Sequence, residues 1–248
     1  MGSVTSTSPV RTLVCGTGRM GALVRAAVEA DEALCLVGQV GIDDVRALET
    51  PGALPEADLV IDFTNVAMLP HLTAYLRHSP AALVSGTTGL GPDEQALLDE
   101  LSQRMPVMWS ANYSLGVAVL RRLAAEAAQA LQGFDIEIVE THHNQKADAP
   151  SGTAKLLLSA VDPDGQCSVA HGRDGMVGAR PAREVGMHAL RGGTVAGTHE
   201  VHFFGLDEEV CLTHRAASRQ IFVSGAVAAA KRLVGREPGR YAFEDLML

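Results

Sequence analysis

The first half of the chain alternates short apolar runs with longer stretches in which apolar residues recur at helical spacing. Five of the runs predict strands, at residues 12–15, 34–40, 58–63, 81–85 and 106–109. Three of the stretches between them predict amphipathic helices, at residues 20–30, 66–77 and 92–104. Nearly continuous apolar strands that alternate with helices are typical of a parallel sheet covered on both faces.

The pattern changes near Trp109. An alanine-rich helix is expected at residues 115–132, followed by a strand at 134–141 and another helix that begins near Ser151. A Gly- and Asp-rich loop is expected at residues 162–181. Three strand-like runs then follow without helices between them, at residues 183–191, 194–204 and 209–214. Consecutive strands of this kind predict an antiparallel or mixed sheet.

These patterns predict an α/β protein with two domains. Residues 1–110 are expected to form an N-terminal Rossmann-type parallel sheet, completed by residues 219–248. Within that C-terminal part, the small-residue-rich stretch 222–234 predicts a helix that packs back onto the first domain. Residues 111–218 are expected to form a second, α+β domain on a mixed or antiparallel sheet.

Composition and charge restrict the class of function. Of the 248 residues, 47% are hydrophobic and 20% charged, an ordinary balance for a globular protein. The formal net charge of −9 argues against nucleic-acid binding. No apolar run reaches the length of about 18 residues that a membrane span needs, so we expect no membrane association. An acidic protein that binds an acidic substrate must gather positive charge locally, and such a cluster is sought below.

The N-terminus and the cysteines bear on location. The first ten residues lack the apolar core of a signal peptide; Gly2 and Ser6 match a myristoylation pattern, but a polar leader is the preferred interpretation. Cysteines occur at four positions, Cys15, Cys35, Cys167 and Cys211. They show no Cys-x-x-Cys spacing, and three lie in apolar strand-like runs, where a thiol is expected to be a small buried hydrophobe. We therefore expect a cytoplasmic protein without disulfides or a bound metal.

A glycine-rich turn follows the first predicted strand. It reads Gly16, Thr17, Gly18, Arg19, Met20, Gly21. The spacing Gly-x-Gly-x-x-Gly fits the dinucleotide-binding pattern, in which glycines permit a tight turn and backbone amides approach a pyrophosphate at a helix N-terminus. The same spacing occurs in turns without ligands, but its place in the first strand–turn–helix unit favours a nicotinamide dinucleotide. Arg19 adds a positive charge there.

Two other turns lie at predicted strand ends, where open α/β sheets bind ligands. One contains Phe63, and the other contains Gly86, Thr87 and Thr88. Ordinary turn chemistry is the alternative for both, and Phe63 is equally consistent with a core residue. At the end of the second strand, residues 38–41 hold neither an acidic residue for a ribose nor a basic one for a 2′-phosphate. The sequence thus leaves open whether the cofactor is NADH or NADPH.

The densest polar segment is residues 140–154, between a predicted strand and a predicted helix. Ser151 suits the N-cap of that helix, and the amides of Gly152 and Thr153 are then placed to bind a carboxylate. Three basic side chains, those of His142, His143 and Lys146, precede them within five residues. The alternatives are that the histidines bind a metal, that Lys146 is solvated and that Ser151 only caps the helix. No partner spacing supports a metal, and the combination favours an anion-binding active site.

The segment closely resembles the signature of the dihydrodipicolinate reductase (4-hydroxy-tetrahydrodipicolinate reductase) family of the diaminopimelate–lysine pathway. That signature reads E-x-H-H-x-x-K-x-D-A-P-S-G-T-A, and this chain matches each fixed position from Glu140 to Ala154. The resemblance covers nearly the whole chain. It includes the segments at residues 18–21, 62–64, 86–89, 111–114, 172–173 and 183–193.

The resemblance implies a role for each matching residue. His142 is expected as the catalytic acid/base, with Lys146 as a proton donor beside it. His143, Ser151, Gly152 and Thr153 are expected to bind substrate carboxylate. The cofactor, NADH or NADPH, is expected on residues 16–21, on Phe63, on Gly86, Thr87 and Thr88, and on Ser110, Ala111, Asn112 and Tyr113. A homotetramer built through the sheet of the second domain is also implied.

Three positions depart from the family pattern. Cys15 stands where a glycine is usual, Gly41 where an acidic residue follows the second strand, and Tyr113 where phenylalanine is common. Gly41 leaves the cofactor preference open, and Tyr113 adds a hydroxyl.

The mechanism that we infer is hydride transfer to a conjugated imine after loss of the 4-hydroxyl as water. His142 or Lys146 then protonates the resulting enamine. Two other functions fit the same sequence: a paralogous reductase of a related cyclic imine, and a non-catalytic sensor of NAD(P). The sensor does not require the lysine or the anion-binding helix entry, both of which are present.

Overall fold

The computed structural model describes residues 8–248, so Gly2 and Ser6 of the myristoylation pattern lie outside the described part. The chain divides into two compact units. The first consists of the chain up to Tyr113 together with Phe222–Leu248, and the second is Ser114–Ile221. The first unit is therefore discontinuous in sequence. In the described part of the chain, no helix combines the length and the apolar character needed to cross a bilayer.

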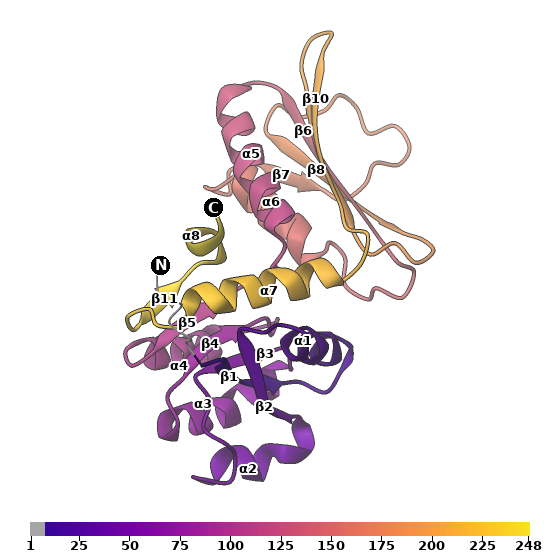
Figure 1. The fold of residues 1–248 in the computed structure, drawn as a ribbon. Coiled ribbons are helices and arrows are strands. Elements are labelled where there is room, and N and C mark those ends of the chain that lie inside the picture. Colours follow the sequence, from indigo (N-terminus) through magenta and orange to yellow (C-terminus); the bar gives the residue numbers. More distant parts are fainter. Residues whose placement is uncertain (1–7) are drawn as a thin grey trace, which may run out of the picture. The chain divides into compact units, whose positions relative to one another are not determined.

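The first unit is built on a six-stranded parallel sheet (Figure 1). Its strands are β1 (Val10–Cys15), β2 (Leu34–Val40), β3 (Leu59–Asp62), β4 (Ala82–Ser85), β5 (Pro106–Trp109) and β11 (Gly239–Tyr241), in the spatial order β11-β5-β4-β3-β1-β2. The central strands are fully buried, which explains why they are almost wholly apolar. The order reverses at β1, so the crevice beside the carboxyl ends of β1 and β3 is the place where such sheets bind ligands.

Helices accompany these strands along the chain. They are α1 (Arg19–Glu29), α2 (Val45–Glu49), α3 (Leu69–His78), α4 (Pro92–Ser102), α7 (Gln220–Leu233) and α8 (Phe243–Met247). The first turn of the helix predicted at 66–77 is a 3-10 turn, Val66–Met68, that continues into α3. Three short elements, α2, β11 and α8, escaped prediction because elements of three to five residues show no full hydrophobic period.

The second unit contains a five-stranded mixed sheet covered on one face by two helices (Figure 1). Its strands are β6 (Asp135–His142), β7 (Ser168–Ala170), β8 (Glu184–Arg191), β9 (Thr198–Phe204) and β10 (Glu209–Arg215), in the order β10-β9-β6-β8-β7. The helices are α5 (Leu115–Ala130) and α6 (Gly152–Val161). Ile138, Val201 and Phe203 point to the helices and form the core with Leu120 and Leu157. We call the opposite face of this sheet, which carries Glu137, His188, His202 and Cys211, the open face.

The predicted fold class is confirmed, with differences in detail. The consecutive strands β8 and β9 do not pair with each other, because β6 lies between them, parallel to β8 and antiparallel to β9. Residues 162–181 are not entirely loop, since Ser168–Ala170 forms β7 along the edge of β8. Strand pairing between distant segments decided both points.

The cysteine prediction was wrong at two of the three strand positions. Cys15 is buried, but Cys35 and Cys211 are exposed. The two exposed cysteines lie on β2 and β10, which are edge strands of their sheets. Because successive side chains of a strand point to opposite faces, an apolar run at an edge does not bury every member. All four cysteines are free thiols.

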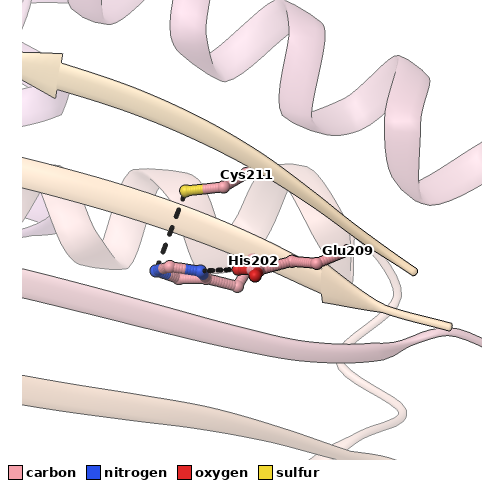
Figure 2. Close-up of side chains that lie close together, drawn as sticks. All are labelled: His202, Glu209 and Cys211. Carbon is pink, nitrogen blue, oxygen red and sulfur yellow. Dashed lines mark hydrogen bonds and ion pairs between the residues drawn. The ribbon is translucent and has the colours of Figure 1, made fainter. Parts of the chain in front are cut away.

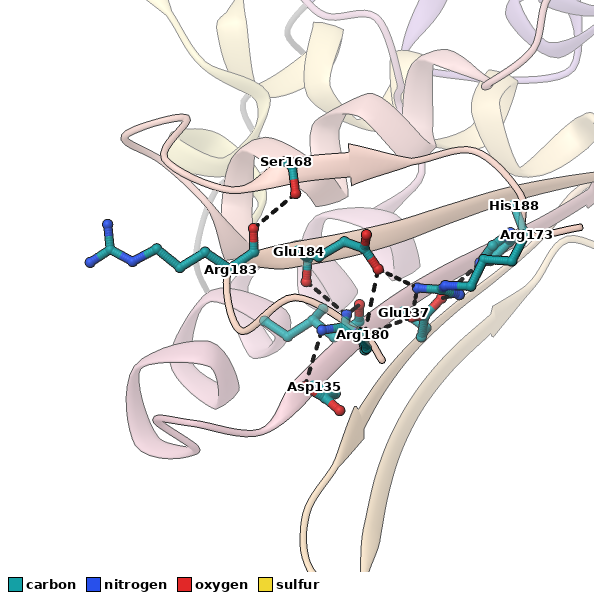
Figure 3. Close-up of polar contacts among 9 residues, drawn as sticks. Asp135, Glu137, Ser168, Arg173, Arg180, Arg183, Glu184 and His188 are labelled. Atoms are coloured by element: carbon teal, nitrogen blue, oxygen red, sulfur yellow. Dashed lines mark hydrogen bonds and ion pairs between the residues drawn. The ribbon is translucent and has the colours of Figure 1, made fainter. Parts of the chain in front are cut away.

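An ion-pair cluster around Glu137 ties residues 171–183 to the open face (Figure 3). Arg173 Nη2 donates to Glu137 Oε1 at 2.8 Å and to Glu184 Oε1 at 2.6 Å. Arg180 Nε donates to Glu137 Oε1 at 3.2 Å, and His188 Nε2 lies 2.7 Å from Glu137 Oε2. Although burial raises the pKa of Glu137, the hydrogen bonds from Arg173, His188 and Arg180 outweigh it and lower the pKa to about 2. The cluster holds a long segment that has little apolar contact of its own.

Candidate active site

Strand register places the predicted cofactor residues of the first unit along one edge. Cys15 is paired with Asp62, Asp62 with Ser85, and Ser85 with Trp109. The residues that follow these positions, Gly16, Phe63, Gly86 and Ser110, therefore emerge side by side at the carboxyl ends of β1, β3, β4 and β5. The sequence presented them as separate turns, and the parallel register brings them together.

The glycine turn requires its glycines for steric reasons. Gly16 has φ +125°, and a Cβ there would lie 2.7 Å from the carbonyl oxygen of Phe63. A Cβ on Gly21 would collide with the carbonyl of Gly16, so α1 begins against the turn itself. Gly18 is the N-cap of α1 and offers no side-chain cap, which leaves the first-turn amides of the helix to an external acceptor. Free amides at the first turn of a helix are donors that an anion can accept from.

Asp62 organises the neighbouring turns. It is buried and accepts hydrogen bonds from Ser85 Oγ at 2.7 Å, Thr87 Oγ1 at 2.9 Å and Thr64 Oγ1 at 2.6 Å. Gly86 lies against the ring of Phe63 so closely that any Cβ would collide with it. Thr87 is buried by these contacts, and its carbonyl accepts a hydrogen bond from Trp109 Nε1 at 2.7 Å. Thr88 is exposed at the edge.

The segment after β5 is also held at this edge. Ser110 N donates to Ser85 O at 3.2 Å, and Ser110 Oγ donates to Asn112 O at 2.7 Å. Tyr113 is buried, its hydroxyl donates to Ser85 O at 2.8 Å, and burial raises its pKa well above 10. The hydroxyl that departs from the family pattern is therefore satisfied inside the unit. The side chain of Tyr113 is part of the core, and only its backbone can face a cofactor.

The end of β2 is held by hydrogen bonds to the turns beside it. The amide of Gly41 donates to Asp44 Oδ2 at 2.8 Å, so this carboxylate caps a short 3-10 turn. Gln39 Nε2 donates to Gly16 O at 2.7 Å and links β2 to the glycine turn. A Cβ on Gly41 would lie 2.8 Å from Thr17 Oγ1.

In the second unit, Glu140 is the centre of the polar segment. Its side chain is fully buried, and its two oxygens accept from Arg191 Nη2 at 2.8 Å and Nη1 at 2.9 Å. It also accepts from the amide of Ser151 at 3.0 Å and lies 2.5 Å from His142 Nδ1. Burial raises the pKa of Glu140, but the hydrogen bonds from Arg191 and His142 overcome this and lower it. A permanent carboxylate therefore holds the histidine.

This arrangement determines which nitrogen of His142 is available. The ionised Glu140 accepts a hydrogen bond from His142 Nδ1, so Nδ1 carries the proton. The other ring nitrogen, Nε2, points away from Glu140. Nε2 lies beside Gly197, where a Cβ would come within 3.1 Å, and Gly197 has φ +154°. The His142 side chain is 11% exposed. Nε2 can accordingly accept or donate a proton at the edge of the sheet.

His199 packs edge-to-face on His142, with ring centroids 5.1 Å apart. Its Nε2 lies 3.1 Å from Ser151 Oγ, and its Nδ1 has no hydrogen-bond partner among residues 8–248. Burial, reinforced by the neighbouring His142, lowers the pKa of His199 to about 4. His199 is neutral at pH 7 and does not add charge to the site.

The predicted anion-binding residues lie in one strand–loop–helix segment around these groups. Ser151 is the N-cap of α6, and its Oγ accepts from the amide of Ala154 at 3.2 Å. Gly152 and Thr153 form the first turn of α6. Lys146 Nζ lies 2.7 Å from Asp148 Oδ1, a pairing that a substrate carboxylate would have to replace or share.

His143 is hydrogen-bonded to an arginine that the sequence analysis did not single out. Arg219 Nη2 donates to His143 Nε2 at 3.2 Å, so the histidine acts as an acceptor and is neutral in this arrangement. The guanidinium of Arg219 supplies the positive charge instead. The cationic donors of the site are then Lys146 and Arg219.

Four residues of the site were missed by sequence reasoning as functional groups: Glu140, Arg191, His199 and Arg219. Glu140 had a detectable signal, because a strand places residues two apart on the same face, and Glu140 precedes His142 by two. The others come from β8, β9 and the segment after β10, and no local spacing connects them to His142.

Comparisons with known proteins agree with the resemblance. Residues 10–113 match the profile described as "Dihydrodipicolinate reductase, N-terminus", and residues 116–247 match "Dihydrodipicolinate reductase, C-terminus". A 4-hydroxy-tetrahydrodipicolinate reductase from Akkermansia muciniphila is 44% identical over 241 residues, which cover 95% of this chain and 96% of the relative. One from a Nitratiruptor species is 41% identical over 245 residues, with 94% and 96% coverage.

Among solved structures, a dipicolinate-bound dihydrodipicolinate reductase from Paenisporosarcina sp. TG-14 is similar in fold. Its TM-score is 0.72 at 21% identity, with 96% of this chain and 99% of the other covered.

Proposed function

The chain belongs to the dihydrodipicolinate reductase family, and we propose on this basis that it reduces 4-hydroxy-tetrahydrodipicolinate to tetrahydrodipicolinate with NAD(P)H, in the diaminopimelate route to lysine. The relatives that match nearly the full chain carry this activity in their names. The observation that carries the proposal is the buried Glu140 carboxylate, which holds both His142 Nδ1 and the amide of Ser151 at the N-terminus of α6, in the segment that also carries Lys146. This is an acid/base group next to donors for anions.

A nicotinamide dinucleotide fits the carboxyl edge of the first unit. The fit rests on the backbone cradle, where a Cβ on Gly16, Gly21 or Gly86 would fill the space or strike the neighbouring turn. The turn at residues 16–21 would hold the pyrophosphate, with Arg19 nearby, while Gly86, Thr87, Thr88 and residues 110–113 would line the nicotinamide end. When bound, the cofactor supplies a hydride to the substrate ring.

The residues of the second unit then act on charge and protons. Lys146, Arg219 and the first-turn amides of α6 bind the two carboxylates of the substrate. The carboxylate of Glu140 keeps His142 with its proton on Nδ1, so that Nε2 is the atom that exchanges a proton with the substrate. Lys146 is the second candidate donor. Protonation of the ring carbon next to the new C–H bond completes the reduction of the double bond.

An assay tests the proposal directly. Oxidation of NADH and NADPH is followed with freshly prepared 4-hydroxy-tetrahydrodipicolinate, for wild type, His142→Gln and the control His171→Gln, which alters an exposed histidine of the same unit. We expect His142→Gln to lower kcat about 100-fold or more with a small change in KM, and the control to match wild type. If His142→Gln turned over the substrate as fast as wild type, His142 would have no part in the chemistry.

The same assay separates the alternatives. A paralogous reductase of another cyclic imine would oxidise the cofactor only with that imine, and a sensor would bind the cofactor without turnover of either compound. Binding of pyridine-2,6-dicarboxylate provides a second measurement, since Lys146→Met is expected to weaken it.

We expect the protein to use both NADH and NADPH as hydride donors. Residues 38–41 carry no acidic side chain against a 2′-phosphate and no basic one for it, and Asp44, one of the two carboxylates that follow, accepts from the amide of Gly41. The values of kcat/KM for NADH and NADPH should therefore lie within about tenfold of each other. Gly41→Asp requires a slight shift of the Thr17 side chain. It should lower kcat/KM for NADPH and leave kcat/KM for NADH nearly unchanged.

Assembly as a homotetramer in the cytoplasm completes the proposal. The open face supports association through the second sheet, because it carries the partly exposed apolar side chains of Leu190 and Phe204, 49% and 40% exposed. Four free thiols suit a reducing compartment. Sedimentation equilibrium tests the assembly, and Phe204→Glu is expected to shift it towards smaller species.

A further inference from the structure

Asp62 is a buried carboxylate at the carboxyl end of β3 that the proton chemistry described above does not use. Its Oδ1 accepts from the amide and the hydroxyl of Thr64, at 3.0 and 2.6 Å. Its Oδ2 accepts from Ser85 Oγ at 2.7 Å and from Thr87 Oγ1 at 2.9 Å. All of these donors are neutral groups, so they stabilise the carboxylate through their dipoles and leave its negative charge in place.

Other carboxylates of the chain contact groups that can be cationic. Glu137 contacts two arginines and a histidine. Glu209 Oε1 lies 2.6 Å from Nδ1 of His202, whose Nε2 is directed at Cys211 on the other side of the ring (Figure 2). Among residues 8–248, by contrast, no lysine, arginine or histidine forms a hydrogen bond or an ion pair with Asp62. Its charge is therefore buried without a cationic partner, and a buried charge is screened much less than one at the surface.

The charge of Asp62 acts on its neighbours. Burial first, and then the charge of Asp62, raise the pKa of the Cys15 thiol and that of the Tyr113 hydroxyl. Both shifts have the sign expected of a negative charge that opposes a second negative charge nearby. The same field stabilises a positive charge that is brought to this part of the unit.

Strand register relates this field to the proposed cofactor edge. Asp62 is paired with Cys15 on β1 and with Ser85 on β4, so it lies one position before the turns that begin at Gly16 and Gly86. These turns are assigned above to the nicotinamide dinucleotide. The oxidised nicotinamide ring carries a positive charge, whereas the reduced ring is neutral. A negative charge beneath this edge therefore distinguishes the two forms of the cofactor.

We propose that Asp62 tunes the redox balance of the bound cofactor, because its charge favours the oxidised nicotinamide over the reduced one and so makes the reduced form a stronger hydride donor. The inference rests on the proposed function, from which it takes the identity of the cofactor and its place on this edge. The effect requires charge but no direct contact, so it can act from beneath the turns. A tenfold bias towards the oxidised form lowers the potential of a bound two-electron couple by about 30 mV.

Equilibrium binding of both cofactor forms tests the proposal without any substrate. The dissociation constants of NADH and NADPH are measured by fluorescence, and those of NAD⁺ and NADP⁺ by calorimetric titration, for wild type and Asp62→Asn. The asparagine has nearly the same shape and no charge. We expect the ratio Kd(oxidised)/Kd(reduced) to rise at least about fivefold in Asp62→Asn. Damage to the turns alone would weaken both forms alike and leave the ratio unchanged.

Two variants that keep the charge of Asp62 serve as controls. Thr64→Val removes a donor from the same turn, and its ratio should stay within about twofold of wild type. Asp58→Asn removes an exposed carboxylate just before β3, at the opposite end of the strand, where it pairs with Arg11 at 2.8 Å. Its ratio should equal that of wild type. If circular dichroism shows that Asp62→Asn does not fold, Asp62→Ser removes the same charge with a smaller polar side chain.

The outcomes separate this inference from the proposed function. An unchanged ratio in the neutral variant of Asp62, or an equal rise in Asp58→Asn, would overturn the inference while tight binding of both forms still supported a nicotinamide-dependent enzyme. If wild type bound neither form of either dinucleotide, the proposed function would fail together with the inference.

Discussion

At the scale of single residues, the site depends on a buried carboxylate whose two oxygens are hydrogen-bonded by the protein itself. Glu140 accepts hydrogen bonds from Arg191, from His142 and from the amide of Ser151. Burying a charge is costly unless it is paired and hydrogen-bonded, and here the pairing is complete enough to lower the pKa of the carboxyl. We regard Glu140 as a positioning residue that selects the tautomer of His142.

Replacing Glu140 by glutamine should therefore affect turnover more than binding. Loss of the negative charge removes the preference for a proton on Nδ1, so we expect kcat to fall at least about tenfold with KM within about threefold. Stability should fall by about 2 kcal/mol, because Arg191 loses its charged partner. Steady-state kinetics and urea unfolding measure the two effects.

Glu137→Gln is the control, since Glu137 also contacts a histidine and two arginines but lies on the open face of the same strand. It should lower stability without lowering kcat. Equal loss of kcat in both variants would show that the effect is only structural.

A buried neutral histidine makes stability depend on pH. The pKa of His199 is lowered from 6.5 to about 4 in the folded protein, first by burial and then by His142. Between these values the unfolded chain binds a proton that the folded chain does not, so stability is complete above pH 6.5 and decreases as the pH falls towards 4. The contribution is up to about 3 kcal/mol.

The measurement compares urea unfolding of wild type and His199→Asn at pH 7.5 and pH 4.5. The variant should lose less stability between the two pH values, even if it is less stable at both. A pH dependence identical to that of wild type would contradict the neutral state of His199.

At the scale of elements, β6 and α6 form the site because one ends and the other begins beside Glu140. Ser151 connects them in three ways: its amide donates to Glu140, its hydroxyl caps α6, and its Oγ lies near His199. Ser114 caps α5 in the same manner, with Oγ accepting from Val117 N at 3.3 Å and lying 3.4 Å from His214 Nε2. The two caps are thus structurally alike and differ in what surrounds them.

Ser151→Ala and Ser114→Ala should cost similar stability, about 1 kcal/mol each, because each removes an N-cap. Only Ser151→Ala should also weaken binding of pyridine-2,6-dicarboxylate, since the α6 N-terminus is the proposed carboxylate site. Calorimetric titration with this compound distinguishes the variants. Equal affinities for both would argue against a role of this helix entry in binding.

The long elements were predictable and the pairings were not. Strands at residues 34–40 and 106–109 were predicted with their observed bounds, because each is a short and mostly apolar run. The order β9-β6-β8 was not predicted, since alternation along a strand says which face is buried but not which strand lies beside it. The same reason hid Arg191 and His199 from the predicted site.

At the scale of the whole molecule, the chain leaves the first unit after Tyr113 and re-enters it at Phe222. Helix α7 crosses the exit point closely, and Gly225 lies against the carbonyl of Tyr113, where a Cβ would collide with backbone. The returning segment adds β11 beside β5 and packs Phe243 edge-on to Tyr113, with ring centroids 5.4 Å apart. The first unit is therefore complete only when the segment before Ser114 and the segment from Phe222 onward are both present.

Gly225→Ala tests this closure. In an ordinary helix the change would stabilise by about 1 kcal/mol, but here the backbone contact should reverse the sign and destabilise by about 1–3 kcal/mol. Ser224→Ala, at an exposed position of the same helix, should be neutral or slightly stabilising. Thermal unfolding with and without cofactor provides the comparison. Stabilisation by Gly225→Ala would mean that α7 does not press on Tyr113.

The sequence by itself determined the alternation of strands and helices, the glycine turn, the helix entry at Ser151 and the family, because these depend on residue type and spacing within short segments. Tertiary structure alone decided that β6 separates β8 from β9, that Arg191 and His199 converge on Glu140 and His142, and that His202 meets Cys211. These meetings join residues from 9 to 57 positions apart. Hydrogen bonding between strands, rather than any local preference, sets which of them become neighbours.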